Sequence, residues 1–132
     1  MADKRKRKLE TARPDLPKPR QYGDDSAEIG IIAICAGWGA GVDTVDELDK
    51  LGTSAQLHHP RTLMPLTDET YAFIESKDRV YVIDHNSTGQ LAGILRYAGV
   101  PGDKLRSILR YDGTPLRPMD LSREIQGRET QS

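Results

Sequence analysis

Five side chains with metal-binding or nucleophilic chemistry follow apolar segments of this sequence: Cys35, His58, His59, Asp84 and His85. In a parallel sheet the carboxyl ends of neighbouring strands meet at one edge, so these residues would lie near a common rim. A thiolate with imidazoles would suit zinc, or a cysteine nucleophile with a base.

The spacing of these residues fits no known ligand signature, however, and neighbours on a strand such as His58 and His59 point to opposite faces. A lone cysteine is usually a small buried hydrophobe. We therefore interpret the rim as structural, and the sequence leaves open whether it has any chemistry.

A second motif with a chemical interpretation is the segment GWGAG at residues 37–41. It follows a predicted strand and precedes a predicted helix, as a phosphate-binding turn would. The third glycine of a G-x-G-x-x-G motif would fall at position 42, which is Val42. The second strand also ends in histidines, where a dinucleotide site would have an acid for the ribose. Because a Walker lysine motif is missing too, we expect these glycines to serve only a tight turn.

Apolar patterning supplies the elements that would position these residues. Residues 29–35 form a continuous, β-branched apolar run that is typical of a strand buried on both faces. An amphipathic helix is predicted over residues 40–51, and a short strand over residues 54–59. Thr67 then has the side chain of a helix N-cap, with acids in the turn that follows it.

The second half of the chain continues the alternation of strands and helices. Ser87 lies three residues before Gln90, the spacing of a capping box at the start of a helix. The predicted elements are a strand over 80–83, a helix over 91–98, a strand over 107–111 and a last helix from Pro118 to Gly127. Strands that alternate with helices in this way predict an α/β fold, a three-layer α/β/α sandwich with a mainly parallel sheet.

The composition describes one ordinary globular domain. The chain has 132 residues, of which 36% are hydrophobic and 30% charged, and its net charge is -1, which argues against a disordered chain or a nucleic-acid binder. With Cys35 as the only cysteine, the chain has no internal disulfide and cannot supply the thiolates of an iron–sulfur cluster. The start of the sequence lacks a signal-peptide pattern, and the longest apolar run is too short for a bilayer. We expect a cytoplasmic location without a membrane contact.

Charge is divided unevenly along the chain. Residues 1–20 carry eight basic and three acidic side chains. We expect residues 1–25, which contain three prolines and little apolar surface, to be a basic linker arm outside the core. The α/β domain would then cover residues 26–127, and residues 128–132 would be a disordered tail. The run KRKRK at residues 4–8 lacks the interleaved aromatics of a nucleic-acid site, so we interpret it as solvated charge and expect no nucleic-acid partner.

Residues 80–91, VYVIDHNSTGQL, resemble a segment of the alpha subunits of 2-oxoacid:ferredoxin oxidoreductases, in which a V-Y-V-V strand runs into E-x-N-x-x-G-Q-L. Residues 6–12 are similar to the connector that precedes the C-terminal domain of those subunits, and residues 111–116, YDGTPL, to their Y-D-G-x-P-L. The similar segments stand in the family's order. Asp84 replaces the family's usual Glu, and the Gly-Trp-Gly segment replaces its Gly-Ser/Thr form.

The resemblance, to enzymes of the 2-oxoglutarate synthase type, implies a domain like the C-terminal domain of transketolase, with a structural or assembly role. The full complex would use thiamine diphosphate, Mg²⁺, iron–sulfur clusters and coenzyme A to convert a 2-oxoacid, 2-oxoglutarate or pyruvate, to an acyl-CoA and to reduce ferredoxin. The G-D-G…Asn signature of thiamine enzymes is missing from this sequence, as are cluster cysteines. We therefore expect no catalytic, cofactor-binding or metal-binding residue in the chain, and no activity of the chain alone.

The partners that the resemblance implies are the thiamine-binding domain of the same subunit, the beta subunit and, through the complex, ferredoxin. The residues expected at a domain or subunit contact are Asp84, His85, Asn86, Gln90 and Asp112. Two other functions stay open. One is a free-standing regulatory module of the same shape that binds a nucleotide or coenzyme A, and the other is an independent thiol enzyme or metalloenzyme.

Overall fold

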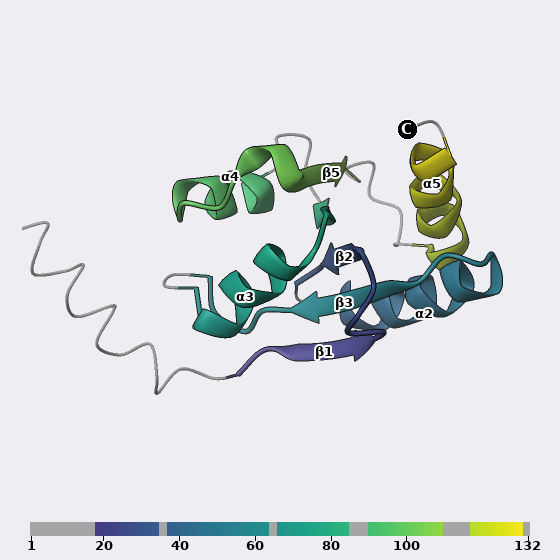
Figure 1. Ribbon diagram of the computed structural model, residues 1–132, viewed down its shortest axis with the longest axis horizontal. Coiled ribbons are helices and arrows are strands. Elements are labelled where there is room, and N and C mark those ends of the chain that lie inside the picture. The colour runs from purple at the N-terminus through teal and green to yellow at the C-terminus, as the bar shows by residue number, and fades with distance from the viewer. Residues whose placement is uncertain (1–17, 35–36, 64–65, 85–89, 110–116, 131–132) are drawn as a thin grey trace, which may run out of the picture.

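A five-stranded sheet forms the centre of the molecule, a computed structural model that describes residues 18–34, 37–63, 66–84, 90–109 and 117–130 (Figure 1). The strands are β1 (Arg20–Gly23), β2 (Ile29–Ile32), β3 (Ala55–His59), β4 (Arg79–Asp84) and β5 (Leu105–Leu109). Their order in the sheet is β1-β3-β2-β4-β5. Strands β2 to β5 pair in parallel, and only β1 pairs antiparallel, with β3. The predicted mainly parallel sheet is confirmed.

Helices cover both faces of this sheet. They are α2 (Gly37–Lys50), α3 (Asp68–Ser76), α4 (Gln90–Tyr97) and α5 (Pro118–Thr130), with a 3-10 turn η2 (Gly102–Lys104) before β5. Side chains of α2 and α5 share one core cluster, and side chains of α3 and α4 share the other, so the three-layer α/β/α sandwich is confirmed. Among the described residues, no helix is long and apolar enough to cross a membrane.

Strand β2 lies in the middle of the sheet, and all of its residues are buried. Ile29 and Ile31 belong to the cluster under α2 and α5, and Ile32 to the cluster under α3 and α4. A Cβ atom on Gly30 would lie 2.8 Å from the Phe73 ring, so α3 packs directly against the strand backbone at this point. Each fully buried isoleucine stabilises the fold by about 1.5–3 kcal/mol, which explains why this apolar run forms the central strand.

Helix α2 begins earlier than predicted. The segment from Gly37 to Gly41, which we expected to be a tight turn, is the first part of the helix. A Cβ atom on Gly41 would lie 2.7 Å from a methyl carbon of Leu57 on β3. This glycine therefore permits close packing of the helix on the sheet, and the interpretation of the whole segment as a turn is wrong.

The N-terminal edge of the sheet also differs from the prediction. Residues 20–23 were expected in a linker arm, but they form β1 and pair with β3. The hydroxyl of Tyr22 donates to Asp46 of α2 at 2.7 Å. Gly23 has a φ of 110°, in the left-handed region that favours glycine, and ends the strand. Residues 1–17 of the expected arm lie outside the described residues.

Two boundaries near the C-terminus shift as well. Strand β5 lies two residues before the predicted position, directly after the turn at η2. Helix α5 continues through Gly127 to Thr130, so residues 128–130 are helical and the prediction of a disordered tail is wrong for them.

The predicted N-cap of α3 is confirmed, because the Thr67 side chain accepts a hydrogen bond from the Thr70 amide at 3.3 Å.

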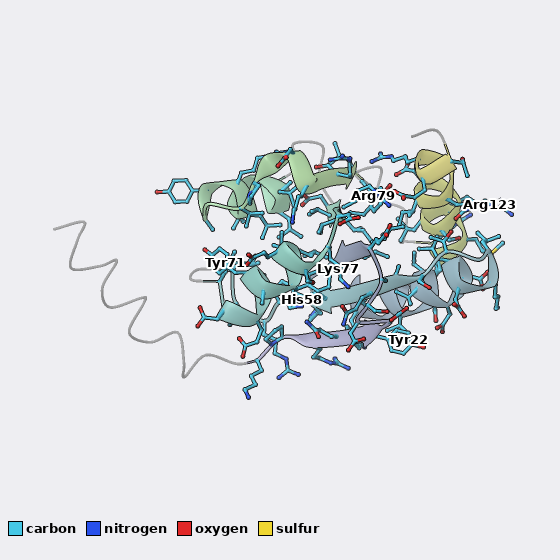
Figure 2. The ribbon with its side chains drawn as sticks, viewed as in Figure 1. Tyr22, His58, Tyr71, Lys77, Arg79 and Arg123 are labelled. Carbon is cyan, nitrogen blue, oxygen red and sulfur yellow. The ribbon has the colours of Figure 1, made fainter. Side chains whose placement is uncertain are left out.

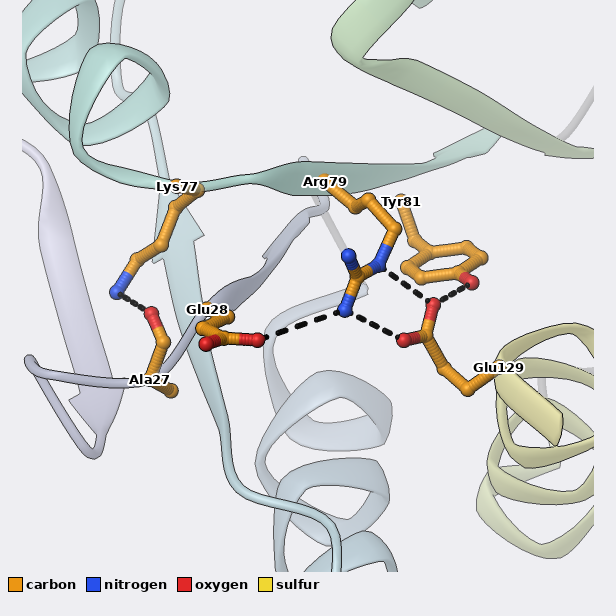
Figure 3. A network of polar contacts seen from close by, with 6 residues as sticks. All are labelled: Ala27, Glu28, Lys77, Arg79, Tyr81 and Glu129. Carbon is orange, nitrogen blue, oxygen red and sulfur yellow. Dashed lines mark hydrogen bonds and ion pairs between the residues drawn. The ribbon is translucent and has the colours of Figure 1, made fainter. Parts of the chain in front are cut away.

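The last turn of α5 is held against β4 by the carboxylate of Glu129 (Figure 3). It accepts from Nε of Arg79 at 3.0 Å and from the Tyr81 hydroxyl at 2.5 Å, and it pairs with Nη2 of Arg79 at 2.7 Å. Burial, followed by the hydrogen bond to Glu129, raises the pKa of Tyr81, so this hydroxyl stays a donor at neutral pH. Charge-assisted bonds of this kind offset the cost of a glycine inside the helix, which is about 1 kcal/mol.

A buried lysine connects α3 with the loop between β1 and β2. The side chain of Lys77 points into the molecule, where Nζ donates to the carbonyl of Ala27 at 2.9 Å and to that of Asp25 at 3.3 Å (Figures 2 and 3). Only 1% of this residue is exposed, and burial lowers the pKa of its amine. The loop that leads into β2 is therefore anchored by a residue some fifty positions later in the sequence.

We predict that Glu129→Gln lowers the free energy of unfolding by about 1–3 kcal/mol. The amide lacks the negative charge of the Glu129 carboxylate, which both Arg79 and Tyr81 contact. The matched control is Glu47→Gln, which removes an exposed ion pair with Lys50 on α2 and should cost less than about 1 kcal/mol. Urea unfolding followed by circular dichroism measures both. Equal midpoints for the two variants would show that Glu129 does not hold α5 in place.

Candidate functional site

The carboxyl-end edge of the sheet brings together part of the predicted rim. Strand β3 ends with His58 and His59, strand β4 ends with Asp84, and both strands flank β2. Cys35, His85, Asn86 and Asp112, which were also predicted for this rim or for a subunit contact, lie outside the described residues. The described part of the rim therefore consists of one carboxylate and two imidazoles.

His58 points toward α3 and is fully buried. Its Nδ1 lies 2.8 Å from Nε2 of Gln21 on β1, and its Nε2 lies 2.8 Å from the hydroxyl of Thr70 on α3. The amide oxygen of Gln21 accepts from Gln56, which leaves the Gln21 amide nitrogen to donate to Nδ1 of the ring. The neutral ring then donates from Nε2 to Thr70. The ring also stacks on Phe73, with 4.5 Å between centroids.

The buried position of His58 determines the charge of its ring. Burial, with a smaller contribution from the neighbouring His59, lowers its pKa to about 4. The ring is therefore neutral at physiological pH, and both nitrogens have partners inside the domain. A histidine in this position fixes β1 to α3, and neither nitrogen is directed to a ligand.

His59 occupies the opposite face of the sheet, as predicted for neighbours on a strand. Its ring meets the edge of Trp38 on α2, with 5.7 Å between centroids. The Arg20 guanidinium lies 4.1 Å from the centroid of the same indole. The two imidazoles therefore diverge, and no group of three potential ligands for a metal ion occurs within the part of the chain that the structure describes.

Asp84, which we expect at a domain or subunit contact, lies at the end of β4 and contacts the start of α4. Only 4% of this residue is exposed. Its carboxylate accepts from the Leu91 amide at 3.0 and 3.1 Å and from the Ala92 amide at 3.4 Å. The carboxylate thus satisfies amides of the first turn of α4, where the helix dipole also favours a negative charge. The capping box predicted for Ser87 with Gln90 lies partly outside the described residues.

The structure brings together three residues of this region that the sequence did not indicate: Arg20, Gln21 and Trp38. Arg20 and Gln21 were assigned to the arm, and Trp38 to a turn. Their contacts depend on the antiparallel pairing of β1 with β3, in which Arg20 is the partner of His59 and Gln21 the partner of His58. A signal for this pairing was present only in the polar and aromatic segment RQYG ahead of the central strand.

Comparisons with known proteins identify the fold. No family model and no curated protein matches the sequence. Among solved structures, the chain is similar to 2-oxoglutarate:ferredoxin oxidoreductase from Magnetococcus marinus, with a TM-score of 0.76 and 21% identity over 89% of this chain and 21% of that chain. It is also similar to the alpha chain of a probable 2-oxoacid ferredoxin oxidoreductase from Thermoplasma acidophilum, with a TM-score of 0.56 and 21% identity over 84% of this chain and 96% of that chain.

A split-gene transketolase, described as an inactive beta4 tetramer, shares the fold as well, with a TM-score of 0.60 and 16% identity over 82% of this chain and 40% of that chain. Identities this low establish the fold alone. The fold is the one that the sequence resemblance implied, a transketolase-like α/β sandwich that also occurs in 2-oxoacid:ferredoxin oxidoreductases. The chain spans about a fifth of the length of the Magnetococcus marinus enzyme chain.

The burial of His58 predicts a pH dependence of stability. The unfolded histidine binds a proton near pH 6.5, whereas the folded one does so only near pH 4. Between these values the unfolded state binds more protons, so stability is complete above about pH 6.5 and falls by up to about 3 kcal/mol toward pH 4.

Urea unfolding of the wild type and of His58→Gln between pH 7.5 and pH 4 isolates this contribution, since glutamine does not titrate and carboxylates titrate in both proteins. The difference in unfolding free energy between them should shrink as the pH decreases. A constant difference would contradict the neutral, buried state of His58.

Proposed function

We propose that this chain is the C-terminal domain of the alpha subunit of a 2-oxoacid:ferredoxin oxidoreductase and acts there in assembly, without catalytic residues of its own. The observation that carries the proposal is the similarity to the Magnetococcus marinus enzyme over 89% of the chain. It is supported by the three segments of sequence that resemble these subunits and stand in the family's order. Strand β4 belongs to one of these segments, and the other two lie outside the described residues.

The chemistry would then belong to other modules. The complex would decarboxylate a 2-oxoacid on thiamine diphosphate and Mg²⁺, pass electrons through iron–sulfur clusters to ferredoxin and release an acyl-CoA. The Magnetococcus marinus structure contains 2-oxoglutarate, coenzyme A and succinyl-CoA, and we propose 2-oxoglutarate or pyruvate as the substrate here. The described residues do not fit the metal of this chemistry, because no three potential ligands converge among them. We place the complex in the cytoplasm, where ferredoxin and free thiols are compatible with its chemistry.

The proposed partners are the thiamine-binding domain of the same subunit and the beta subunit. We propose that the junction of β4 and α4, with Gln90 at its surface and His85, Asn86 and Asp112 as further contact residues, faces one of them. Asp84 would contribute indirectly, because its carboxylate orients the first turn of α4. The basic run at residues 4–8 would meet acids on the neighbouring domain, and Leu9 would add an apolar contact.

The arm provides the test. We predict that deletion of residues 2–17 weakens binding to the rest of the alpha subunit with the beta subunit by about tenfold, since exposed ion pairs contribute up to about 1 kcal/mol each and several act together. The deletion stops before Arg20 because residues 20–23 form β1. Melting of the isolated chain should change little, because the deleted residues precede every strand of the described sheet.

Binding is measured by biolayer interferometry in a salt series, with Arg123→Gln as a control for loss of surface charge. The same chains are titrated with duplex and single-stranded oligonucleotides. Tight oligonucleotide binding that falls steeply with salt, together with no binding to the partner modules, would contradict the proposed role of the arm.

A further inference from the structure

One residue each from β1, α2 and β3, together with Arg61 from the loop after β3, forms a positively charged corner at the β1 side of the rim. We name it the Arg20–Arg61 corner. Arg20 starts β1, Trp38 lies in the first turn of α2, His59 ends β3, and Arg61 follows two residues later. The guanidinium of Arg20 stacks on the indole, and the indole contacts the imidazole edge to face. Both arginines are close enough to His59 to lower the pKa of its ring.

Two buried polar atoms, one in this corner and one on the residue that follows Arg61, have no partner among the described residues. They are Nδ1 of His59 and the hydroxyl oxygen of Thr62. Because an unsatisfied buried polar group costs about 1–3 kcal/mol, such atoms usually meet a water, an ion or a ligand. The Ala33 backbone raises the pKa of the His59 ring, as a hydrogen-bond acceptor does. Because Nδ1 has no partner, we assign the proton of the neutral ring to Nε2, and the bare Nδ1 becomes a second donor when the ring is protonated.

Positive charge in the corner is not balanced by the described part of the chain. Arg20 and Arg61 are both exposed, and no carboxylate among the described residues pairs with either. The first turn of α2, which holds Trp38, contains no acidic residue. The helix dipole therefore adds to the positive field of the two guanidiniums instead of being neutralised.

We propose that the Arg20–Arg61 corner binds a tetrahedral oxyanion such as the phosphate group of a small molecule. Arg20 and Arg61 flank the anion, the Thr62 hydroxyl donates to it, and His59 takes up a proton from solvent at Nδ1 to donate as well. The exposed arginine side chains turn toward the ligand as it enters. A doubly charged, four-oxygen anion matches two guanidiniums and an imidazolium better than a single carboxylate does. This binding site does not depend on the proposed role in an oxidoreductase.

Proton uptake makes the binding dependent on pH. In the free protein, burial lowers the pKa of His59, Arg20 and Arg61 lower it further, and the Ala33 backbone opposes them. The uncharged Trp38 is the ring in contact with it, while His58 lies on the opposite face of the sheet. A bound anion favours the imidazolium, so it raises this pKa. Affinity therefore increases as the pH falls below neutrality and levels off once the free ring is protonated.

Sulfate is the probe for this proposal, because it remains a dianion over the whole pH range, and the protein is the full 132-residue chain. Titrations at constant ionic strength are followed by the amide signals of residues 20, 38, 59 and 61 in NMR spectra. We expect saturable shifts at these residues, and affinity about threefold or more higher at pH 5.5 than at pH 7.5. Inorganic phosphate at pH 7.5 should bind at the same residues, and acetate should bind more weakly.

The variants assign the contacts. Arg61→Gln and Arg20→Gln should each weaken sulfate binding by about tenfold, as expected for the loss of a charged hydrogen-bond donor. The control Arg123→Gln removes the same charge from α5, far from the start of β1 (Figure 2), and should bind like the wild type. His59→Asn should abolish the pH dependence, and if that variant does not fold, the arginine variants still decide the outcome. Shifts that do not saturate, equal losses in Arg123→Gln and Arg61→Gln, or acetate binding as tightly as sulfate would each overturn the proposal.

Discussion

Burial of β2 on both faces determines where the other strands and helices of the domain lie. Every residue of this strand is buried. The ring of Phe73 and the side chain of Lys77 pack so closely on Gly30 that a Cβ atom there would collide with them. A strand of this kind needs helices on both sides and parallel neighbours, because crossovers place the helices there. The flanking strands β3 and β4 consequently end at one edge, which is where His58, His59 and Asp84 lie.

The buried polar residues of the domain connect elements that are distant in the sequence. Lys77 joins α3 to the loop before β2, and Glu129 joins α5 to β4. His58 joins β3 to β1 and α3. Each has hydrogen-bond partners inside the domain, which is the arrangement expected of groups that orient a fold. A fixed surface of this kind suits the assembly role that we propose.

The sequence predicted the elements whose stability comes from local apolar periodicity. The central strand, the N-cap at Thr67 and the divergence of His58 and His59 follow from rules that act within a few residues. Strand β1 could not be predicted in this way. Its four residues are all exposed, and it is held by hydrogen bonds from Gln21 and Tyr22 to residues some 24 to 37 positions later.

Two further differences have similar causes. Glycine often ends a helix, but α5 continues past Gly127 because Glu129 accepts hydrogen bonds from Arg79 and Tyr81 on β4. The first turn of α2 was interpreted as a loop because of its glycines, whereas Gly41 is required by the approach of Leu57. The Arg20–Arg61 corner was missed for the same reason as β1, since two of its contacts exist only when this strand joins the sheet.

We propose that this domain supports a thiamine-dependent oxidoreductase without taking part in its chemistry. The most direct measurement is 2-oxoacid- and CoA-dependent reduction of a viologen dye by an alpha subunit truncated before this domain, assembled with its beta subunit, with the chain added in trans. We expect no turnover by the chain alone, reduced turnover by the truncated complex, and recovery that saturates as the chain is added. Turnover by the isolated chain above a buffer blank, or a truncated complex whose activity the chain does not change, would contradict it.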